Sequence, residues 1–299
     1  MAIHIFGMIL THQGTFANNR GENEGNATTL QKVFRKGELY TTVSAESIRY
    51  ALREHWQAAG ESLNRVVEGQ RSCSFCHREF NKWHENLDDD VLGFMHAQKD
   101  TLSRRGILEI TRAVSLTPWR GEIMHNFATA GSNPAVSTSN PIPYAVEVHD
   151  TRYHYGFALT PEYFGREGLG SEDTLSFDEK ASRLAKVLSG LASLRRVGGN
   201  HARYFADYSP EAIVLRVTDD PAPRFLYCFA QDEVGNLSLE ALKARVEGED
   251  IKPSELIIGS SLNISGANEL ESLGATIHRG VMKAVEEAVS RFKGLAATA

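Results

Sequence analysis

The segment from Arg104 to Pro118, which reads RRGILEITRAVSLTP, constrains the fold more than any other part of the chain. Residues 107–116 form a short apolar run that contains several β-branched side chains, and such a run predicts a buried strand. Arg104, Arg105 and Arg112 stand before and within this run. Because guanidinium groups bind phosphate through paired hydrogen bonds, their placement indicates that the strand meets a polyanion.

The size and composition are those of a water-soluble protein with an ample core. The chain has 299 residues, of which 41% are hydrophobic and 23% charged, enough for one large or two small domains. It contains no run of about 18 apolar residues that would span a membrane. The first ten residues lack a basic region and a cleavage site, so they predict a strand and not a signal peptide. Three cysteines favour a reducing cytoplasm.

The net charge of −6 argues against a simple nucleic-acid-binding protein, because such proteins usually carry a basic surplus that neutralises phosphate. The charge is distributed unevenly, however. Residues 180–203 include six Lys or Arg and no acid, whereas acids collect at 85–90 and 247–255. The basic segment is either a solvated helix face or a phosphate-binding surface.

Apolar residues on both faces predict a central strand at 3–10, and the polar, Gly- and Asn-rich stretch at 11–29 predicts a long surface loop. Ser44 is the expected N-cap of a helix. The buried stripe of that helix is expected to comprise Ile48, Ala51, Leu52, Trp56, Ala59 and Leu63. Further strands are expected at 107–116, 152–160, 212–217, 224–230 and 256–259, and further helices at 177–194 and 277–292.

With its insertions set aside, this order is strand, helix, strand, strand, helix, strand. It predicts an α+β protein with a ferredoxin-like, RRM-like βαββαβ core formed by residues 1–60 and 101–299. A charged insertion at 61–100, expected to be helical, follows the first helix. A second insertion at 127–151 contains three prolines and is expected to be an extended excursion.

Two phosphate-binding candidates follow from the residues themselves. Arg49 and Arg53 are four residues apart near a helix start, which predicts that both project from one polar face. The second candidate is the turn Gly198, Gly199, Asn200, His201, Ala202 and Arg203, where two glycines allow close approach of the backbone to a phosphate. Each has a simpler alternative, an exposed helix face in the first case and a helix C-cap in the second.

Metal and catalytic patterns are incomplete. Cys73, Cys76 and the nearby His84 supply about half of a structural zinc site, so a zinc ion remains an alternative to our expectation of no cofactor. The acidic run at 88–90 could hold Mg²⁺, but we interpret it as an exposed turn with one structural carboxylate. The sequence contains no recognisable nucleophile or paired-carboxylate arrangement, so we expect a protein without enzymatic activity.

The motif LGFM at 92–95, followed by the double-Arg strand that ends in SLTP, resembles the DevR-type, Cas-seven family. The segment FRKGELYTTVSAESIRYALR at 34–53 is similar to that family's strand, S-x-x-S and basic helix. The family forms the backbone of type I CRISPR Cascade complexes. The resemblance implies a palm, a finger insertion at 61–100 and a thumb at 127–151. It also implies a non-catalytic subunit that polymerises along CRISPR RNA and presents it to target DNA.

The resemblance further implies partners and contacts. The partners would be CRISPR RNA, target DNA reached through the guide, further copies of the chain, and the large, small and guide 5′-end-capping subunits. Glu46 departs from the pattern, because a carboxylate repels phosphate. The RNA-binding residues implied are Asn19, Arg20, Lys36, Ser44, Ser47, Arg49, Arg53, Arg105, Gly198, Gly199, Asn200, His201 and Arg203.

Two other functions are also compatible with the sequence. A stand-alone protein that binds single-stranded RNA on a ferredoxin-like sheet would need exposed aromatic residues on that sheet. A metal-dependent ribonuclease would use the acids at 88–90 or the Cys and His cluster.

Overall fold

The computed structural model describes residues 2–68, 72–76, 80–97, 101–128, 142–167, 172–198 and 204–296. Strands and helices are both abundant, so the expected α+β class is confirmed. The helices are α1 (Ala45–Ala58), α2 (Leu87–Leu92), α3 (Phe177–Ala192), α5 (Glu240–Glu247), α6 (Ala267–Leu273) and α7 (Val281–Ala296), with short 3-10 helices at Trp83–Glu85, Pro161–Tyr163 and Pro253–Glu255.

The strands of the main sheet are β1 (His4–Thr11), β5 (Lys32–Arg35), β6 (Glu38–Val43), β11 (Glu109–Ile110), β12 (Ala113–Ser115), β16 (Tyr153–Leu159), β17 (Pro210–Thr218), β20 (Leu256–Ser260) and β22 (Thr276–His278). Their order is β22-β20-β17-β1-β16-β12-β6-β5, and β11 also pairs with β16. β1 pairs antiparallel with both β16 and β17. In a βαββαβ layout, a third strand lies antiparallel between the two parallel strands of each βαβ unit. The central strands are arranged in this way, since β1 lies antiparallel between β16 and β17.

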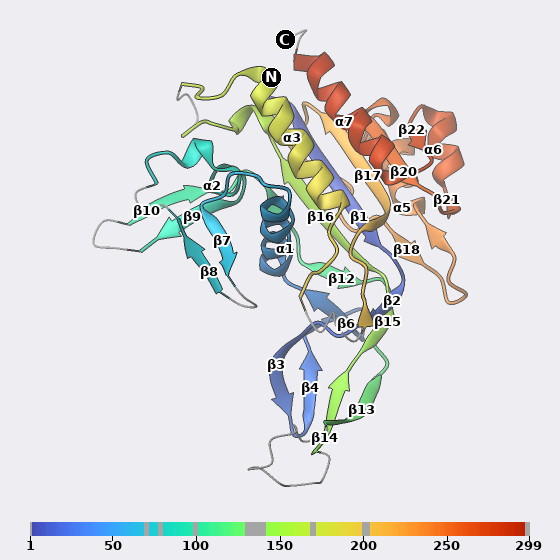
Figure 1. Ribbon diagram of the computed structural model, residues 1–299. Helices are drawn as coiled ribbons and strands as arrows, with labels where there is room; N and C mark the ends of the chain where they lie inside the picture. The colour runs from blue at the N-terminus through green and yellow to red at the C-terminus, as the bar shows by residue number, and fades with distance from the viewer. Residues whose placement is uncertain are drawn as a thin grey trace.

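Both faces of this sheet are covered (Figure 1). On β1, Ile5 and Ile9 face a core formed with α1, α3 and α7, whereas Phe6 and Met8 face a second core formed with α5 and α6. The short strands β18 (Ala230–Gln231), β19 (Leu237–Ser238) and β21 (Ile264–Ser265) join the C-terminal elements on this second side. The prediction of a central strand at 3–10 is therefore confirmed, because alternate side chains enter two different cores.

An arm projects from one end of the sheet, at the bottom of Figure 1. It consists of β3 (Asn19–Glu24), β4 (Ala27–Leu30), β13 (Ile123–Ala128) and β14 (Ile142–Glu147), in the order β13-β14-β4-β3. The long surface loop expected at 11–29 is therefore wrong, since it forms β2 (Gly14–Phe16) and half of this arm. β2 pairs with β15 (His149–Thr151) at the base of the arm. Glu147 joins the two halves, because its Oε2 accepts hydrogen bonds from Leu30 N at 2.7 Å and Lys32 Nζ at 2.5 Å.

The insertion after α1 contains two hairpins in addition to α2. They pair β7 (Arg65–Glu68) with β8 (Ser72–Phe75), and β9 (Gly93–His96) with β10 (Leu102–Arg105). The expectation that the insertion at 61–100 is helical is therefore wrong in part, since strands accompany α2. An aromatic cluster packs this small unit, with the rings of Phe80 and Phe94 stacked 4.0 Å apart. The division of the chain into a palm, a finger and a thumb stays a prediction.

Three further differences from the expected elements have local causes. The strand expected at 224–230 is a turn, because Arg224 and Tyr227 have positive φ angles of 61° and 57°. The strand expected at 107–116 is split into β11 and β12, both of which pair with β16. The last helix begins at Val281, after β22 has added a parallel strand to the sheet. The helix at 177–194 and the strands at 212–217 and 256–259 agree with the structure within a few residues.

The acidic run at 88–90 forms most of α2 and is buried, so its interpretation as an exposed turn is wrong. Asp90 is fully buried, and its carboxylate pairs with Arg104 at 2.5 Å and with Arg183 of α3. It also accepts a hydrogen bond from Gly165 N at 3.1 Å. One carboxylate thereby joins the insertion to two other parts of the chain.

Asp88 and Asp89 face the other side of α2. Asp88 pairs with Arg53 of α1 at 3.4 Å and accepts hydrogen bonds from Asn64 N at 2.8 Å and Arg65 N at 3.0 Å. Asp89 accepts a hydrogen bond from Asn64 Nδ2 at 2.7 Å. Burial, together with the neighbouring charge of Asp88, raises the pKa of Asp89 to about 7.

We expect Asp90→Asn to lower the free energy of unfolding by about 3–5 kcal/mol, because two buried guanidinium groups lose their counter-charge. Urea denaturation measures this change. Glu109→Gln is the matched control: it breaks the exposed pair with Arg105 and should change the free energy by less than about 1 kcal/mol. Equal effects of the two substitutions would show that the Asp90 carboxylate does not hold the insertion against the rest of the chain.

We expect Asp89→Asn to stabilise the protein above neutral pH. The carboxyl titrates near pH 7 in the folded protein and near pH 4 in the unfolded chain, so its ionisation lowers stability as the pH rises between these values. The amide removes that loss. The variant should exceed the wild type by on the order of 1–3 kcal/mol at pH 8, and the difference should vanish near pH 4. Urea denaturation across this pH range tests the prediction, and a constant difference would contradict it.

Candidate nucleic-acid interface

The start of α1 presents hydroxyl groups at a helix N-terminus. Ser44 is the N-cap, as predicted, with extended backbone angles of φ −72° and ψ 150°. Its Oγ accepts a hydrogen bond from Ser47 N at 3.3 Å, and the two serine hydroxyls are 3.2 Å apart. Because amides and the positive end of the helix dipole gather at such a turn, it suits an anionic group.

Gly198 lies against this helix start, although the two are far apart in the sequence. A Cβ atom added at Gly198 would lie 3.7 Å from Ser47 Oγ and 3.9 Å from Asn18 Oδ1. The φ angle of Gly198 is +59°, a left-handed conformation that favours glycine. The structure thus brings together Ser44, Ser47 and Gly198, three of the residues implied as RNA contacts.

Other implied contacts fall outside what the structure describes. Gly199, Asn200, His201 and Arg203 lie outside the described residues. Asn19 and Arg20 belong to β3, at the base of the arm, and only their backbone is described.

The prediction that Arg49 and Arg53 project from one exposed polar face is wrong. Arg53 is 8% exposed and pairs with Asp88, and Arg49 donates a hydrogen bond from Nη2 to Leu108 O at 3.1 Å. This face of α1 packs against the insertion and the segment before β11, because the two guanidinium groups satisfy a buried carboxylate and a carbonyl. Arg53 is therefore a structural residue in this fold.

The arginines at the start of the 104–118 segment have separate roles. Arg104 is held by Asp90 and lies with its guanidinium 3.7 Å from the centre of the Trp83 ring, so it is a core residue. Arg105 is 88% exposed and pairs with Glu109 at 2.6 Å. Lys36 lies at the turn between β5 and β6, with a φ angle of +50°.

The basic segment at 180–203 is only partly available to a polyanion. Lys180 pairs with Asp173, Arg183 with Asp90 and Lys186 with Glu61. Arg195 and Arg196, between α3 and Gly198, are exposed. Among the described cations of this segment, the exposed ones that form no salt bridge with a described residue therefore lie next to the Gly198 turn.

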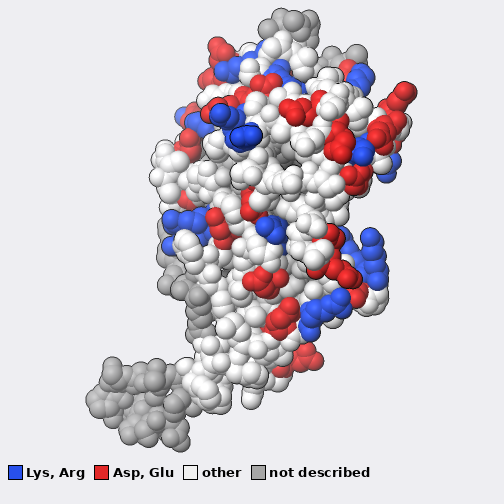
Figure 2. All heavy atoms as spheres, turned by 90° about the vertical axis from the view of Figure 1, so that its right-hand side faces the viewer, with Lys and Arg blue, Asp and Glu red and all other residues white. Residues whose placement is uncertain are grey.

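The central strands of the sheet offer no aromatic surface among the described residues, and the exposed Phe34 lies on the edge strand β5. Phe6, Tyr155 and Phe157 of the central strands are at most 5% exposed. Figure 2 shows the side formed by the C-terminal elements, where Lys and Arg are interspersed with Asp and Glu and form no single-sign band. The central strands therefore offer no described aromatic surface on which bases could stack, and this side of the molecule shows no basic stripe that a phosphate backbone could follow.

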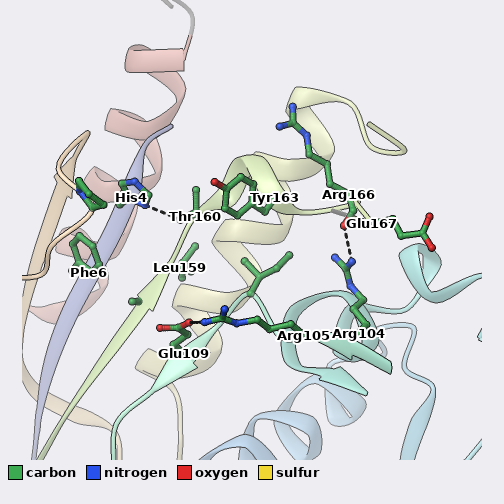
Figure 3. A pocket seen from close by; sticks show the side chains of 14 residues that line it. His4, Phe6, Arg104, Arg105, Glu109, Leu159, Thr160, Tyr163, Arg166 and Glu167 are labelled. Atoms are coloured by element: carbon green, nitrogen blue, oxygen red, sulfur yellow. Dashed lines mark hydrogen bonds and ion pairs between the residues drawn. The ribbon is translucent and has the colours of Figure 1, made fainter. Parts of the chain in front are cut away.

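A cavity of about 430 Å³ opens where β1 begins and β16 ends (Figure 3). His4, Tyr163 and Glu167 line it, and Arg105 and Glu109 form an ion pair on its wall. Arg104 donates a hydrogen bond to Arg166 O at 2.6 Å beside it. Its arginines are mostly engaged with neighbouring oxygens, so the cavity lacks a convergent set of catalytic groups among the described residues.

Within the described part of the chain, no group of three or more His, Cys, Asp or Glu is placed to hold a metal ion. The side chain of Cys73 lies outside the described residues, Cys76 is exposed, and the ring of His84 packs edge-on against Trp83. The zinc alternative therefore stays untested. Nor does any described helix combine the length and apolar character needed to cross a lipid bilayer.

The interface includes residues that the sequence did not reveal. Asn18 is buried, and its Nδ2 donates a hydrogen bond to the hydroxyl of Tyr208 at 3.3 Å. Tyr208 stacks with Tyr153 at 5.9 Å between ring centres. Burial raises the pKa of Tyr208 well above its usual range, so the hydroxyl stays protonated. The only signal in the sequence was the cluster of tyrosines and phenylalanine at 204–208, close after the glycine turn.

Comparison with known proteins agrees with this architecture. Residues 14–236 match the family model of the CRISPR-associated negative auto-regulator DevR/Csa2. The CRISPR-associated protein Cas7/Cst2/DevR of Myxococcus xanthus (strain DK1622) is 40% identical over 98% of this chain and 99% of its own length. A chain from a CRISPR RNA-guided surveillance complex in a pre-nicking state matches 97% of this fold and 100% of its own, with a TM-score of 0.69 and 12% identity. A second surveillance-complex chain matches 97% of this fold and 99% of its own, with a TM-score of 0.63 and 16% identity. The chain therefore belongs to the DevR/Csa2 family of CRISPR-associated proteins.

Proposed function

We propose that this chain is a non-catalytic subunit that binds CRISPR RNA in the cytoplasm and lines up with further copies of itself along that RNA. Membership of the DevR/Csa2 family and the likeness of its fold to chains of CRISPR RNA-guided surveillance complexes support the proposal. The bound RNA keeps its base edges free for target DNA, so that sequence recognition lies in the guide. The large, small and guide 5′-end-capping subunits complete the assembly.

The observation that carries the proposal is the contact of Gly198 with the start of α1. Ser47 Oγ lies 3.7 Å from the position of a Cβ on Gly198, so a helix N-terminus and a left-handed glycine turn share one surface. Hydroxyl and amide donors on such a surface bind phosphate without reading bases. Arg195 and Arg196 add positive charge beside it.

The net charge of −6 is compatible with this mode of binding. Much of the basic charge is used inside the fold, as in the pairs of Arg53, Arg104 and Arg183 with buried carboxylates. The remaining exposed cations need to line only the path of the RNA. Copies joined head to tail use two different surfaces and extend as an open helical array.

The two rival functions are less compatible with the geometry. A stand-alone protein that binds RNA on the sheet requires exposed aromatic residues, but those described on the central strands are buried. A ribonuclease that uses the acids at 88–90 requires solvent-accessible carboxylates, but Asp88, Asp89 and Asp90 are each at most 1% exposed.

The proposal is tested by co-expressing the chain with a CRISPR array and its neighbouring genes. We expect a large particle on size exclusion that contains one discrete RNA of repeat-plus-spacer length. A monomer without nucleic acid under these conditions would overturn the proposal.

We expect Ser47→Asp to weaken binding of CRISPR RNA by roughly tenfold, because a carboxylate at this position repels phosphate. An acid in the first turn favours the helix dipole, so the thermal midpoint should not fall. Fluorescence anisotropy with labelled RNA measures the affinity. Ser182→Asp, at an exposed serine near the start of α3, is the control and should bind as the wild type does.

We expect no cleavage when the purified protein is incubated with single-stranded RNA and Mg²⁺ or Zn²⁺, because the acids of α2 are buried and partnered. Gel electrophoresis of the RNA measures the outcome. Metal-dependent cleavage that disappears in Asp89→Asn or Cys76→Ser would favour the ribonuclease instead.

A further inference from the structure

Phe205 combines two unfavourable properties that the fold does not explain. Its side chain is 86% exposed, and its φ angle is +45°. Exposure of a large apolar ring forgoes hydrophobic stabilisation, and a left-handed backbone is strained for a phenylalanine. A residue held in such a conformation is a candidate for a functional contact.

The neighbours of Phe205 fix its backbone on both sides. Tyr204 packs against a small apolar cluster of Ala17, Val146 and Val148 at the base of the arm. Tyr208 is fully buried and packs edge-on against Phe16, with 5.4 Å between ring centres. The ring of Phe205 is therefore presented to solvent by a segment that is anchored at both ends.

This segment adjoins the interface described above. The hydroxyl of Tyr208 accepts a hydrogen bond from Asn18 Nδ2, and Asn18 Oδ1 lies 3.9 Å from the position of a Cβ on Gly198. A polynucleotide held at Gly198 and Ser47 would therefore lie near Tyr208 and the segment 204–208 that Tyr208 anchors.

We propose that Phe205 is a stacking platform for a base of the bound single-stranded RNA, an inference that rests on the proposed function. Every base has a π-face, so an exposed ring next to phosphate-binding amides holds single-stranded RNA without reading its sequence. The left-handed backbone presents the ring, while the edges of the stacked base stay accessible for pairing.

The test uses the full chain and RNAs that carry 2-aminopurine at successive positions. In the wild type, stacking should quench the fluorescence at particular positions. Phe205→Gly should bind RNA roughly tenfold more weakly and lose this quenching. Its thermal midpoint should stay the same or rise, because glycine adopts φ +45° without strain. Phe205→Trp should retain both the affinity and the quenching.

Two comparisons make the result decisive. Val234→Ala removes an apolar side chain that is also 86% exposed but lies in the turn between β18 and β19, and it should behave as the wild type does. Phe205→Leu keeps an apolar side chain without an aromatic face and should bind RNA as weakly as Phe205→Gly.

Several outcomes would overturn the assignment. RNA affinity and quenching that are unchanged in Phe205→Gly would show that the ring does not contact a base. Restoration by leucine, together with smaller particles for glycine on size exclusion, would identify an apolar contact between copies instead. A wild-type chain that binds no RNA would overturn the proposed function itself, and so is distinct from a failure at Phe205 alone.

Discussion

The arrangement of the domain depends on the contacts of one buried group, the carboxylate of Asp90. It neutralises Arg104 of β10 and Arg183 of α3 and also accepts the amide of Gly165. A buried charge is tolerated only when it is paired and hydrogen-bonded, so these partners hold the insertion in one orientation against the sheet. The neighbouring Asp88 then fixes α1 through Arg53. Because the ion pair of Arg53 with Asp88 holds the side of α1 that faces the insertion, the first turn of α1 is positioned against Gly198. The candidate interface therefore depends on ion pairs that lie outside it.

The arm depends on a similar joint between distant segments. The parallel pairing of β4 with β14 is short, with Ala27 opposite Ala145 and Thr28 opposite Val146. Glu147 reinforces it by accepting hydrogen bonds from the backbone of Leu30 and the ammonium group of Lys32. The base of this arm carries the apolar cluster against which Tyr204 packs, so the arm and the segment of Phe205 are one structural unit.

Local patterns in the sequence were sufficient to predict those elements that depend on contacts between residues close together in the chain. The N-cap at Ser44, the apolar stripe of α1 as far as Trp56 and the two-sided strand β1 could all be predicted, because each depends on spacing within a few residues. Ala59 was wrongly included in the stripe, since the helix ends at Ala58 and Ala59 is its exposed C-cap. The hairpins β7–β8 and β9–β10 could not, because each strand has only four residues, too few for an alternating apolar pattern to stand out. The strand β4 of the arm could not, because its partner β14 is far away in the chain. Arg53 and the acids of α2 were misread for the same reason: a charged side chain looks exposed until its buried counter-ion is known. The Gly198 turn was identified by its residues, but its contact with Ser47 is a property of the tertiary structure.

The central position of β1 has a consequence for the synthesis of the chain. This strand leaves the ribosome before both of its partners, since β16 and β17 end at Leu159 and Thr218. At about 5–20 residues per second, the nascent chain carries β1 unpaired for on the order of ten seconds or more. During that time a strand that is apolar on both faces can pair with strands of other chains. The nascent protein is therefore an expected client of chaperones that shield apolar segments, and its yield should depend on the rate of translation between residues 11 and 218.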